Sequence, residues 1–170
     1  LKRGVDKREF ANLMKLWTED ARALCTGEAP LGTLEPEMVQ HPANLTITCG
    51  LGEEVFNLLG VDKPQWLKDV RSFKRDALEP KWGQSDIVLQ ICCDDPLMNT
   101  YALRHMVRAG EHYASVKWLQ QGFINAYGSH EKGATARNMF GQKDGTVNPH
   151  SEEDFAAQVW IDKGPKWAQG

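Results

Sequence analysis

The stretch that decides the fold is Ser85-Asp86-Ile87-Val88-Leu89-Gln90-Ile91-Cys92-Cys93-Asp94-Asp95-Pro96. Its apolar run over residues 87–92 predicts a strand that is buried on both faces. Asp95 followed by Pro96 is typical of a helix start, because the acid caps backbone N–H groups and proline suits the first helical position. The sequence therefore predicts a strand that leads into a helix ending at Gly110.

Two further elements are predicted upstream of this stretch. Residues 44–49 alternate polar and apolar side chains and are rich in β-branched residues, which predicts another strand. Asp6 and Glu9 have the spacing of a capping box, so we expect a long helix to begin there and to end at Gly27. A short helix is expected over residues 53–59.

The remaining elements complete the order of the fold. Residues 113–119 predict a third strand and residues 152–158 a last helix. Helix, strand, strand, helix, strand is the order of a ferredoxin-like βαββαβ unit without its first strand. The predicted fold class is therefore α+β, ferredoxin-like, with an antiparallel sheet and packed helices. That first strand is central in the sheet, so we expect it upstream of Leu1, on another chain or in an excised segment.

Composition limits the possible classes of protein. The chain has 170 residues, of which 41% are hydrophobic and 25% charged, with a net charge of −3 and a pI of about 6.0. These values indicate an ordinary globular chain of one domain or slightly more, without a basic surface for nucleic acid. The apolar runs are too short to span a bilayer, and the chain does not open like a signal peptide. Because it begins with Leu1 and not Met, we expect it to start inside a longer product or after processing.

The four cysteines do not have the spacing of a zinc site. We expect Cys25, Cys49, Cys92 and Cys93 to behave as small buried hydrophobic residues. A disulfide between Cys49 and either Cys92 or Cys93 stays open as an alternative if their strands are neighbours.

The loop at residues 133–149 carries the candidate chemistry. It reads Gly133-Ala134-Thr135-Ala136-Arg137-Asn138-Met139-Phe140-Gly141-Gln142-Lys143-Asp144-Gly145-Thr146-Val147-Asn148-Pro149. Gly141 and Gly145 permit backbone angles closed to other residues and allow close approach to a ligand. Because Asp-Gly is also a common turn dipeptide, a surface turn around Asp144 is the alternative interpretation.

Residues 137–149 resemble the GxxDG signature segment of dye-decolorising haem peroxidases. Residues 44–52 with Phe56 resemble that family's second strand and following turn, and residues 85–96 resemble its third strand and helix start. Residues 118–123 resemble the strand end before the signature loop. The resemblance covers nearly the whole chain in order, and it is greatest to the exported bacterial class.

The resemblance implies two ferredoxin-like domains. Residues 1–125 would be the N-terminal domain, and residues 126–170 the distal haem loop and the start of the C-terminal domain, which binds haem b. Asp144 would be the distal acid/base that moves a proton between the peroxide oxygens. Asp144, Gly145 and Thr146 would line the haem edge, and we expect Arg137 and Asn138 to brace the loop.

The resemblance also implies an activity and two alternatives to it. The leading one is a haem peroxidase that reduces hydrogen peroxide and oxidises dyes or phenolic compounds. The first alternative is a haem-binding, iron-releasing protein of the same fold, similar to a deferrochelatase. The second is a ferredoxin-like interaction domain without chemistry of its own.

The metal ligand is expected outside residues 1–170. In the family, the proximal histidine and a distal arginine lie downstream of the signature. None of the five histidines matches that position, and we expect each to be structural or solvated; they are His41, His105, His112, His130 and His150. The ligand is therefore expected beyond Gly170, in the C-terminal half or on a second chain, and this chain alone is expected to be inactive. A homo-oligomer is a further expectation.

Two smaller expectations concern export and surface aromatics. Similarity to the exported class implies a periplasmic or extracellular protein that uses the twin-arginine route, with the cytoplasm as the alternative. Trp160, Trp167 and Tyr127 are candidates for surface radicals that oxidise bulky substrates. Ordinary packing is the favoured interpretation for each of them.

Overall fold

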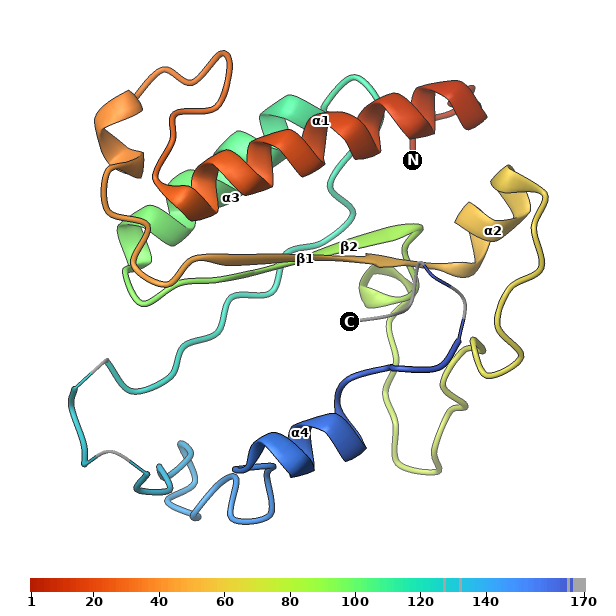
Figure 1. The fold of residues 1–170 in the computed structure, drawn as a ribbon. Helices are drawn as coiled ribbons and strands as arrows, with labels where there is room; N and C mark the ends of the chain where they lie inside the picture. Colours follow the sequence, from red (N-terminus) through yellow and green to blue (C-terminus); the bar gives the residue numbers. More distant parts are fainter. Residues whose placement is uncertain (127, 132, 165, 167–170) are drawn as a thin grey trace. The chain divides into compact units, whose positions relative to one another are not determined.

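Two long helices lie side by side on one face of an antiparallel sheet (Figure 1). This computed structural model describes residues 1–126, 128–131, 133–164 and 166. The chain divides into two compact units, Leu1–Gly122 and Phe123–Gly170, and each is described by itself. Tyr127 and Trp167 lie outside the described residues.

The helices α1 (Lys7–Thr26) and α3 (Pro96–Gly110) have the bounds that their capping residues predict. Asp6 and Glu9 form the expected capping box, in which each side chain accepts the other's backbone N–H. Gly27 ends α1 with φ 80°, a left-handed conformation that favours glycine. The Asp95 carboxylate opens α3 by accepting the Met98 N–H at 2.9 Å.

The sheet consists of β1 (Thr46–Leu51) and β2 (Ile87–Cys92), which are antiparallel. β1 begins two residues later than predicted, because Ala43 and Asn44 adopt left-handed φ angles of 49° and 56°. Residues in that conformation cannot take part in a strand, so the regular ladder starts only at Thr46.

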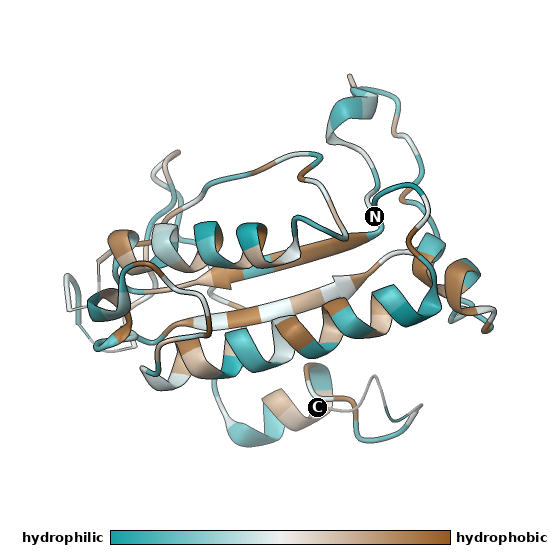
Figure 2. Cartoon of the chain, turned by 90° about the horizontal axis from the view of Figure 1, so that it is seen from above, coloured by the Kyte–Doolittle hydropathy of each residue, from teal (hydrophilic) through white to brown (hydrophobic). Residues whose placement is uncertain are grey.

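Burial of β2 differs from the prediction. Its residues alternate between half-buried and exposed, and the Val88 side chain is 44% exposed. In residues 1–122 only one face of the sheet is covered by α1 and α3, so the expected burial on both faces is wrong for this unit. Figure 2 shows hydrophobic residues along both strands.

Residues 113–119 do not form the predicted third strand. From the sequence we also expect Trp118 in this segment to be a core residue, and that expectation is wrong. Its indole is only half-buried, and its Nε1–H donates to the Gly83 carbonyl at 3.0 Å. The physical reason lies in the topology: the partner of a last strand in the βαββαβ order is the first strand, and residues 1–122 contain only β1 and β2. A chain segment without a neighbouring edge cannot form a ladder, whatever its β propensity.

Shorter elements connect these parts. The helices α2 (Glu53–Leu59) and α4 (Glu152–Gln158) occupy the predicted ranges. Two 3₁₀ turns, Pro36–Val39 and Pro80–Trp82, lie in the connections.

The core of residues 1–122 lies between the two long helices and the sheet. Gly110 allows the close approach of α1 and α3, since a Cβ there would lie 2.6 Å from the ring of Trp17. The Trp17 Nε1–H donates to the Met106 carbonyl at 2.9 Å, which satisfies its only polar atom. The buried cluster is Leu13, Trp17, Leu24, Val39, Leu45, Met98, Tyr101, Ala102 and Met106.

A buried polar pair joins the same helices. The His105 Nε2 lies 3.1 Å from an Asp20 carboxylate oxygen, and both side chains are almost fully buried. The His105 Nδ1 has no hydrogen-bond partner among the described residues. His105 is therefore structural, as expected, but its pairing with Asp20 was not predicted from the sequence.

All four cysteines are free. Neighbouring strands do carry Cys49 and Cys92, but Cys49 is paired with Leu89 and Cys92 with Thr46. This register places the two sulfurs on opposite faces, so the alternative of a disulfide between them is not realised. Burial is also less complete than expected, because Cys49 and Cys92 are exposed.

Candidate functional site

The glycine-rich loop contains a tight turn at residues 138–142. The Asn138 N–H donates to the Gln142 carbonyl at 2.9 Å, and the Gly141 N–H donates to the Asn138 carbonyl at 2.9 Å. The Asn138 side-chain oxygen also accepts the N–H groups of Phe140 and Gln142. Gly141 has φ 78°, which explains why glycine occupies this position.

Arg137 closes the base of this turn. Its backbone forms an antiparallel bridge with Lys143, and its guanidinium donates to the Gly141 carbonyl at 2.5 Å. Arg137 and Asn138 therefore brace the loop as expected, because their side chains bond to backbone groups within it. This bracing holds the segment that leads into Asp144.

The backbone of Asp144 is held and its side chain is free. The Asp144 N–H donates to the Ala136 carbonyl at 2.9 Å. The carboxylate is exposed and makes neither an ion pair nor a hydrogen bond with any residue that the structure describes. A carboxylate in this state can accept a proton and donate it again.

Gly145 and Thr146 follow the acid in a second turn. Gly145 has φ 103°, and a Cβ at this position would lie 2.8 Å from the Asn148 side-chain nitrogen. The Asn148 N–H donates to the Gly145 carbonyl at 3.1 Å. Thr146 is exposed, so its hydroxyl is accessible beside Asp144.

Three large apolar side chains of the same loop are exposed. Met139 is 86% exposed, and Phe140 and Val147 are each 91% exposed. The sequence interpretation did not single out these residues, although apolar residues in a polar, glycine-rich loop were a signal for them. Their side chains give the loop an apolar surface of the kind that a largely apolar ligand needs.

A resident metal would need ligands beyond those that this part of the chain brings together. No group of three histidine, cysteine or acidic side chains converges among the described residues. Four histidines are exposed, and His105 is committed to Asp20; the exposed ones are His41, His112, His130 and His150. The described residues of the loop therefore include an exposed acid and exposed apolar side chains but no histidine.

Family models match most of the chain. The model described as Dyp-type peroxidase, N-terminal, matches residues 3–124, and the model described as Dyp-type peroxidase, C-terminal, matches residues 135–170. The first model covers the antiparallel α+β unit, and the second covers the braced, glycine-rich loop that contains Asp144. Fold and loop together thus define the class of protein. The chain belongs to the Dyp-type peroxidase family.

Solved structures and curated relatives agree with this assignment. A DyP-type peroxidase from Cellulomonas bogoriensis has a TM-score of 0.91 and 34% identity, covering 100% of this chain and 48% of its own. DtpA from Streptomyces lividans, solved as an oxyferrous complex, has a TM-score of 0.85, 33% identity, and coverage of 95% and 45%. These neighbours confirm the predicted α+β, ferredoxin-like fold.

The curated relatives carry another name. A deferrochelatase of Yersinia pestis is 34% identical over 98% of this chain and 43% of its own length. A deferrochelatase of Escherichia coli strain K12 is 31% identical, covering 97% and 44%. The chain thus spans a little under half the length of the relatives it matches. No described helix is long and apolar enough to cross a membrane.

Proposed function

We propose that this chain supplies the distal wall of a haem peroxidase that reduces hydrogen peroxide and oxidises dyes or phenolic compounds. Its cofactor is haem b. Asp144 is the acid/base, and Asp144, Gly145 and Thr146 face the haem edge. Membership of the Dyp-type peroxidase family supports the reaction class.

The proposal rests on one observation at Asp144: its backbone is held by hydrogen bonds, whereas its carboxylate has no partner among the described residues. The backbone hydrogen bond to Ala136 and the Arg137 brace hold the position of the residue. Exposed Phe140 and Val147 on either side offer apolar contact to a flat ligand. A held acid beside an apolar surface suits proton transfer at a cofactor edge.

The chemistry assigned to this chain is proton transfer. When bound, haem supplies the electrons that break the peroxide O–O bond, and the dye or phenol returns them. The Asp144 carboxylate takes the proton from one peroxide oxygen and delivers it to the other, which leaves as water. The acid ends the step ionised, as it began, so one residue serves in both directions.

The test is Asp144→Asn in the haem-loaded protein that contains this chain. We expect the rate of reaction with hydrogen peroxide, followed by the change in the haem Soret band, to fall by ~10²–10⁴-fold, because amides do not accept the proton. Glu153→Gln removes an equally exposed charge from α4 and is the matched control. An unchanged rate in the Asp144 variant would contradict the assignment.

A second candidate function is release of iron from haem, which the name of the curated deferrochelatases favours. It uses the same cofactor but needs no peroxide. Formation of metal-free porphyrin from haem without peroxide would favour it. A third candidate, an interaction domain without chemistry, would show neither a Soret band nor peroxide-dependent dye oxidation.

We further propose that the axial histidine comes from outside residues 1–170, either from the C-terminal half of the protein or from a second chain. This rests on the histidines, of which one is paired with Asp20 and the others are exposed. The chain by itself is then inactive. Copurification of a histidine-bearing polypeptide, or a larger intact mass, is the direct check, and sedimentation tests for a homo-oligomer.

Domain division and export complete the proposal. A boundary near residue 125, with the distal haem loop in residues 126–170, is supported by family matches to residues 3–124 and 135–170. Export to the periplasm or the outside by the twin-arginine route is supported by the resemblance of the signature to the exported class. Fractionation of the host would distinguish export from the cytoplasmic alternative.

A further inference from the structure

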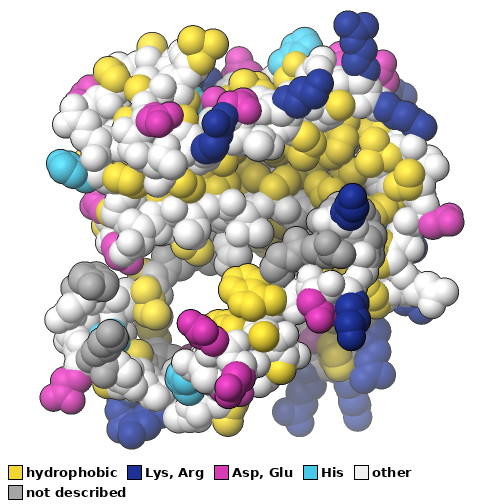
Figure 3. Space-filling view, viewed as in Figure 1, with side chains coloured by type: hydrophobic (Ala, Val, Ile, Leu, Met, Phe, Trp, Pro, Cys, Tyr) yellow, Lys and Arg dark blue, Asp and Glu magenta, His cyan; other side chains and the backbone are white. Residues whose placement is uncertain are grey.

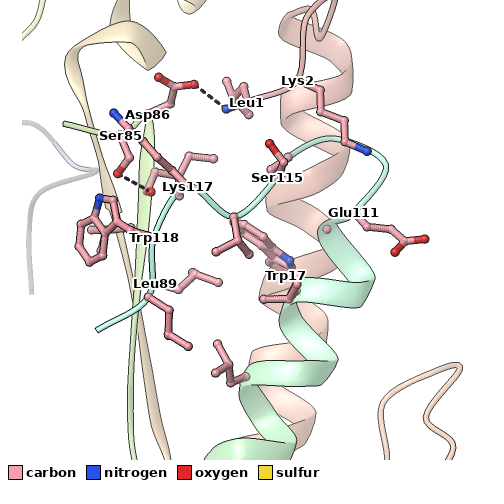
Figure 4. Close-up of a pocket in the computed structure, with 18 of the residues that line it drawn as sticks. Leu1, Lys2, Trp17, Ser85, Asp86, Leu89, Glu111, Ser115, Lys117 and Trp118 are labelled. Carbon is pink, nitrogen blue, oxygen red and sulfur yellow. Dashed lines mark hydrogen bonds and ion pairs between the residues drawn. The ribbon is translucent and has the colours of Figure 1, made fainter. Parts of the chain in front are cut away.

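Two surfaces of residues 1–122 differ in their chemistry. A groove of about 640 Å³ beside β2 is lined by Leu89 and Val107, and Trp17 closes it toward α1 (Figure 4). Figure 3 shows hydrophobic side chains gathered below α1 on the face in view. Because Trp17 is a core residue and Leu89 packs against the core, this groove belongs to the packing of the fold. The long connection between α2 and β2 is instead charged and aromatic (Figure 1).

A tight turn at residues 73–76 holds an exposed aromatic ring in this connection. The Phe73 N–H donates to an Asp76 carboxylate oxygen at 2.7 Å, and the Asp76 N–H donates to the Phe73 carbonyl at 3.0 Å. These two hydrogen bonds fix the backbone of Phe73, whose side chain is 52% exposed. Lys74 and Arg75 occupy the corner of the turn, and both are exposed. The turn therefore presents an aromatic ring next to two cations.

Arg71 adds a third cation and lies over the same ring. Its guanidinium carbon is 5.0 Å from the centroid of the Phe73 ring, which is a cation–π distance. A guanidinium also carries paired N–H donors that match two oxygens of a carboxylate or a sulfonate. Ring and guanidinium thus offer a surface for stacking beside a set of donors for an anion.

The three cations of this turn lack acidic partners. No ion pair and no side-chain hydrogen bond joins Arg71, Lys74 or Arg75 to a described residue. The nearest acid in the sequence is Asp76, and its carboxylate already accepts the Phe73 N–H. The positive charge of the turn is therefore available to an anion from outside the described chain.

This positive charge is confined to a short segment. Residues 71–75 contain three cations and no acid, but Asp69 precedes them and Asp76 follows them. Further along the connection, Lys81 lies over the Trp82 ring in the same way, but its ammonium is paired with Glu79 at 2.7 Å. Acids on both sides repel an extended anionic surface such as a membrane or a nucleic acid, whereas a small anion meets mainly the cations. The chemistry of the turn therefore matches a small, flat aromatic anion.

We propose that residues 71–76 bind flat aromatic anions, of which an aryl sulfonate is the simplest example. The ring of the ligand stacks on the exposed Phe73 side chain. Its anionic group accepts hydrogen bonds from the Arg71 guanidinium, and the charges of Lys74 and Arg75 attract it. This binding needs no peroxide and does not depend on the proton transfer assigned to Asp144.

The test measures the Kd of naphthalenesulfonate by ligand-observed NMR titration, in the haem-loaded protein that contains this chain and without peroxide. Arg71→Gln and Phe73→Leu should each raise the Kd at least ~3-fold, because the first removes the donors for the anion and the second removes the stacking ring. Lys81→Gln and Trp82→Leu are the matched controls, because they alter a similar cation–π pair whose charge is already neutralised by Glu79. They should leave the Kd unchanged.

Two analogues of the ligand separate its ring from its charge. Methyl naphthyl sulfone keeps the ring without the charge, and propanesulfonate keeps the charge without the ring. Each should bind at least ~3-fold more weakly than naphthalenesulfonate. Added salt should weaken binding of the sulfonate, because exposed charges are screened.

Other outcomes overturn the proposal. An absence of binding, or an equal Kd in the Arg71 variant and the unchanged protein, would show that the turn is not the site. Equal losses in the Lys81 and Arg71 variants would mean that any exposed cation suffices. If Arg71→Gln abolished binding to phosphatidylglycerol vesicles while naphthalenesulfonate did not bind, the turn would contact a membrane surface instead. The peroxide reaction should be unchanged in the Arg71 variant, so failure here leaves the assignment of Asp144 intact.

Discussion

The two units of this chain differ in the burial of their apolar side chains. Every buried hydrophobic residue of the described chain lies at or before Met106, in residues 1–122. In the unit from Phe123 onward no described residue is buried, and Phe140 and Val147 are almost fully exposed. The first unit therefore has a core of its own, whereas the second displays a braced loop whose apolar residues are available to a ligand.

The largest expected effect is a loss of unfolding free energy when a side chain in the core of the first unit is truncated. Leu24→Ala removes a fully buried side chain, and we expect the free energy of unfolding to fall by ~2–5 kcal/mol, because a cavity remains. Val147→Ala is the matched truncation in the loop, and we expect a change within about 0.5 kcal/mol. Chemical denaturation measures both, and equal effects would remove the contrast between the units.

The buried polar pair gives the next effect. Asp20→Ala leaves His105 without any hydrogen-bond partner in the core, and we expect a loss of about 1–3 kcal/mol of unfolding free energy. Asp20→Asn keeps an acceptor of nearly the same shape and is the control. Similar losses in the two variants would mean that the hydrogen bond contributes little.

Replacement by alanine at two different glycines should affect stability in one case and activity in the other. Gly110→Ala places a Cβ 2.6 Å from Trp17, and we expect a loss of about 1–3 kcal/mol in unfolding free energy through overpacking. Gly145→Ala strains a φ of 103° beside Asp144 instead. It should slow the peroxide reaction of the haem-loaded protein, with a smaller change in Tm. A reversed pattern would contradict this division of roles.

The smallest effect concerns the start of α4. Hydrogen bonding to the Ser151 side chain and to the Ser151 N–H lowers the pKa of the Asp154 carboxyl from its usual 3.8. The resulting stabilisation is complete above the ordinary pKa and is lost as the pH falls through the lowered value. Ser151→Ala should raise the pKa of Asp154 toward 3.8, as measured by NMR titration. An unchanged pKa of Asp154 in the Ser151 variant would contradict this cause.

Most of the elements were predictable because their signals are local. Asp6 and Asp95 open helices with their own side chains, and Gly27 ends one through its own φ. The predicted start of β1 lies two residues before the observed one. The sequence pattern does not indicate that Ala43 and Asn44 adopt left-handed φ angles. The loop glycines and Asp144 were likewise visible in the sequence, but their catalytic role stays a prediction.

What the sequence alone determined is the order of the elements, their capping and the α+β class, since each depends on residues a few positions apart. Only the tertiary structure decided that residues 113–119 form no strand and that Asp20 pairs with His105. These depend on which backbone and side-chain groups meet across the fold. A strand exists only beside a partner, and a buried charge or histidine is satisfied only by what packs against it.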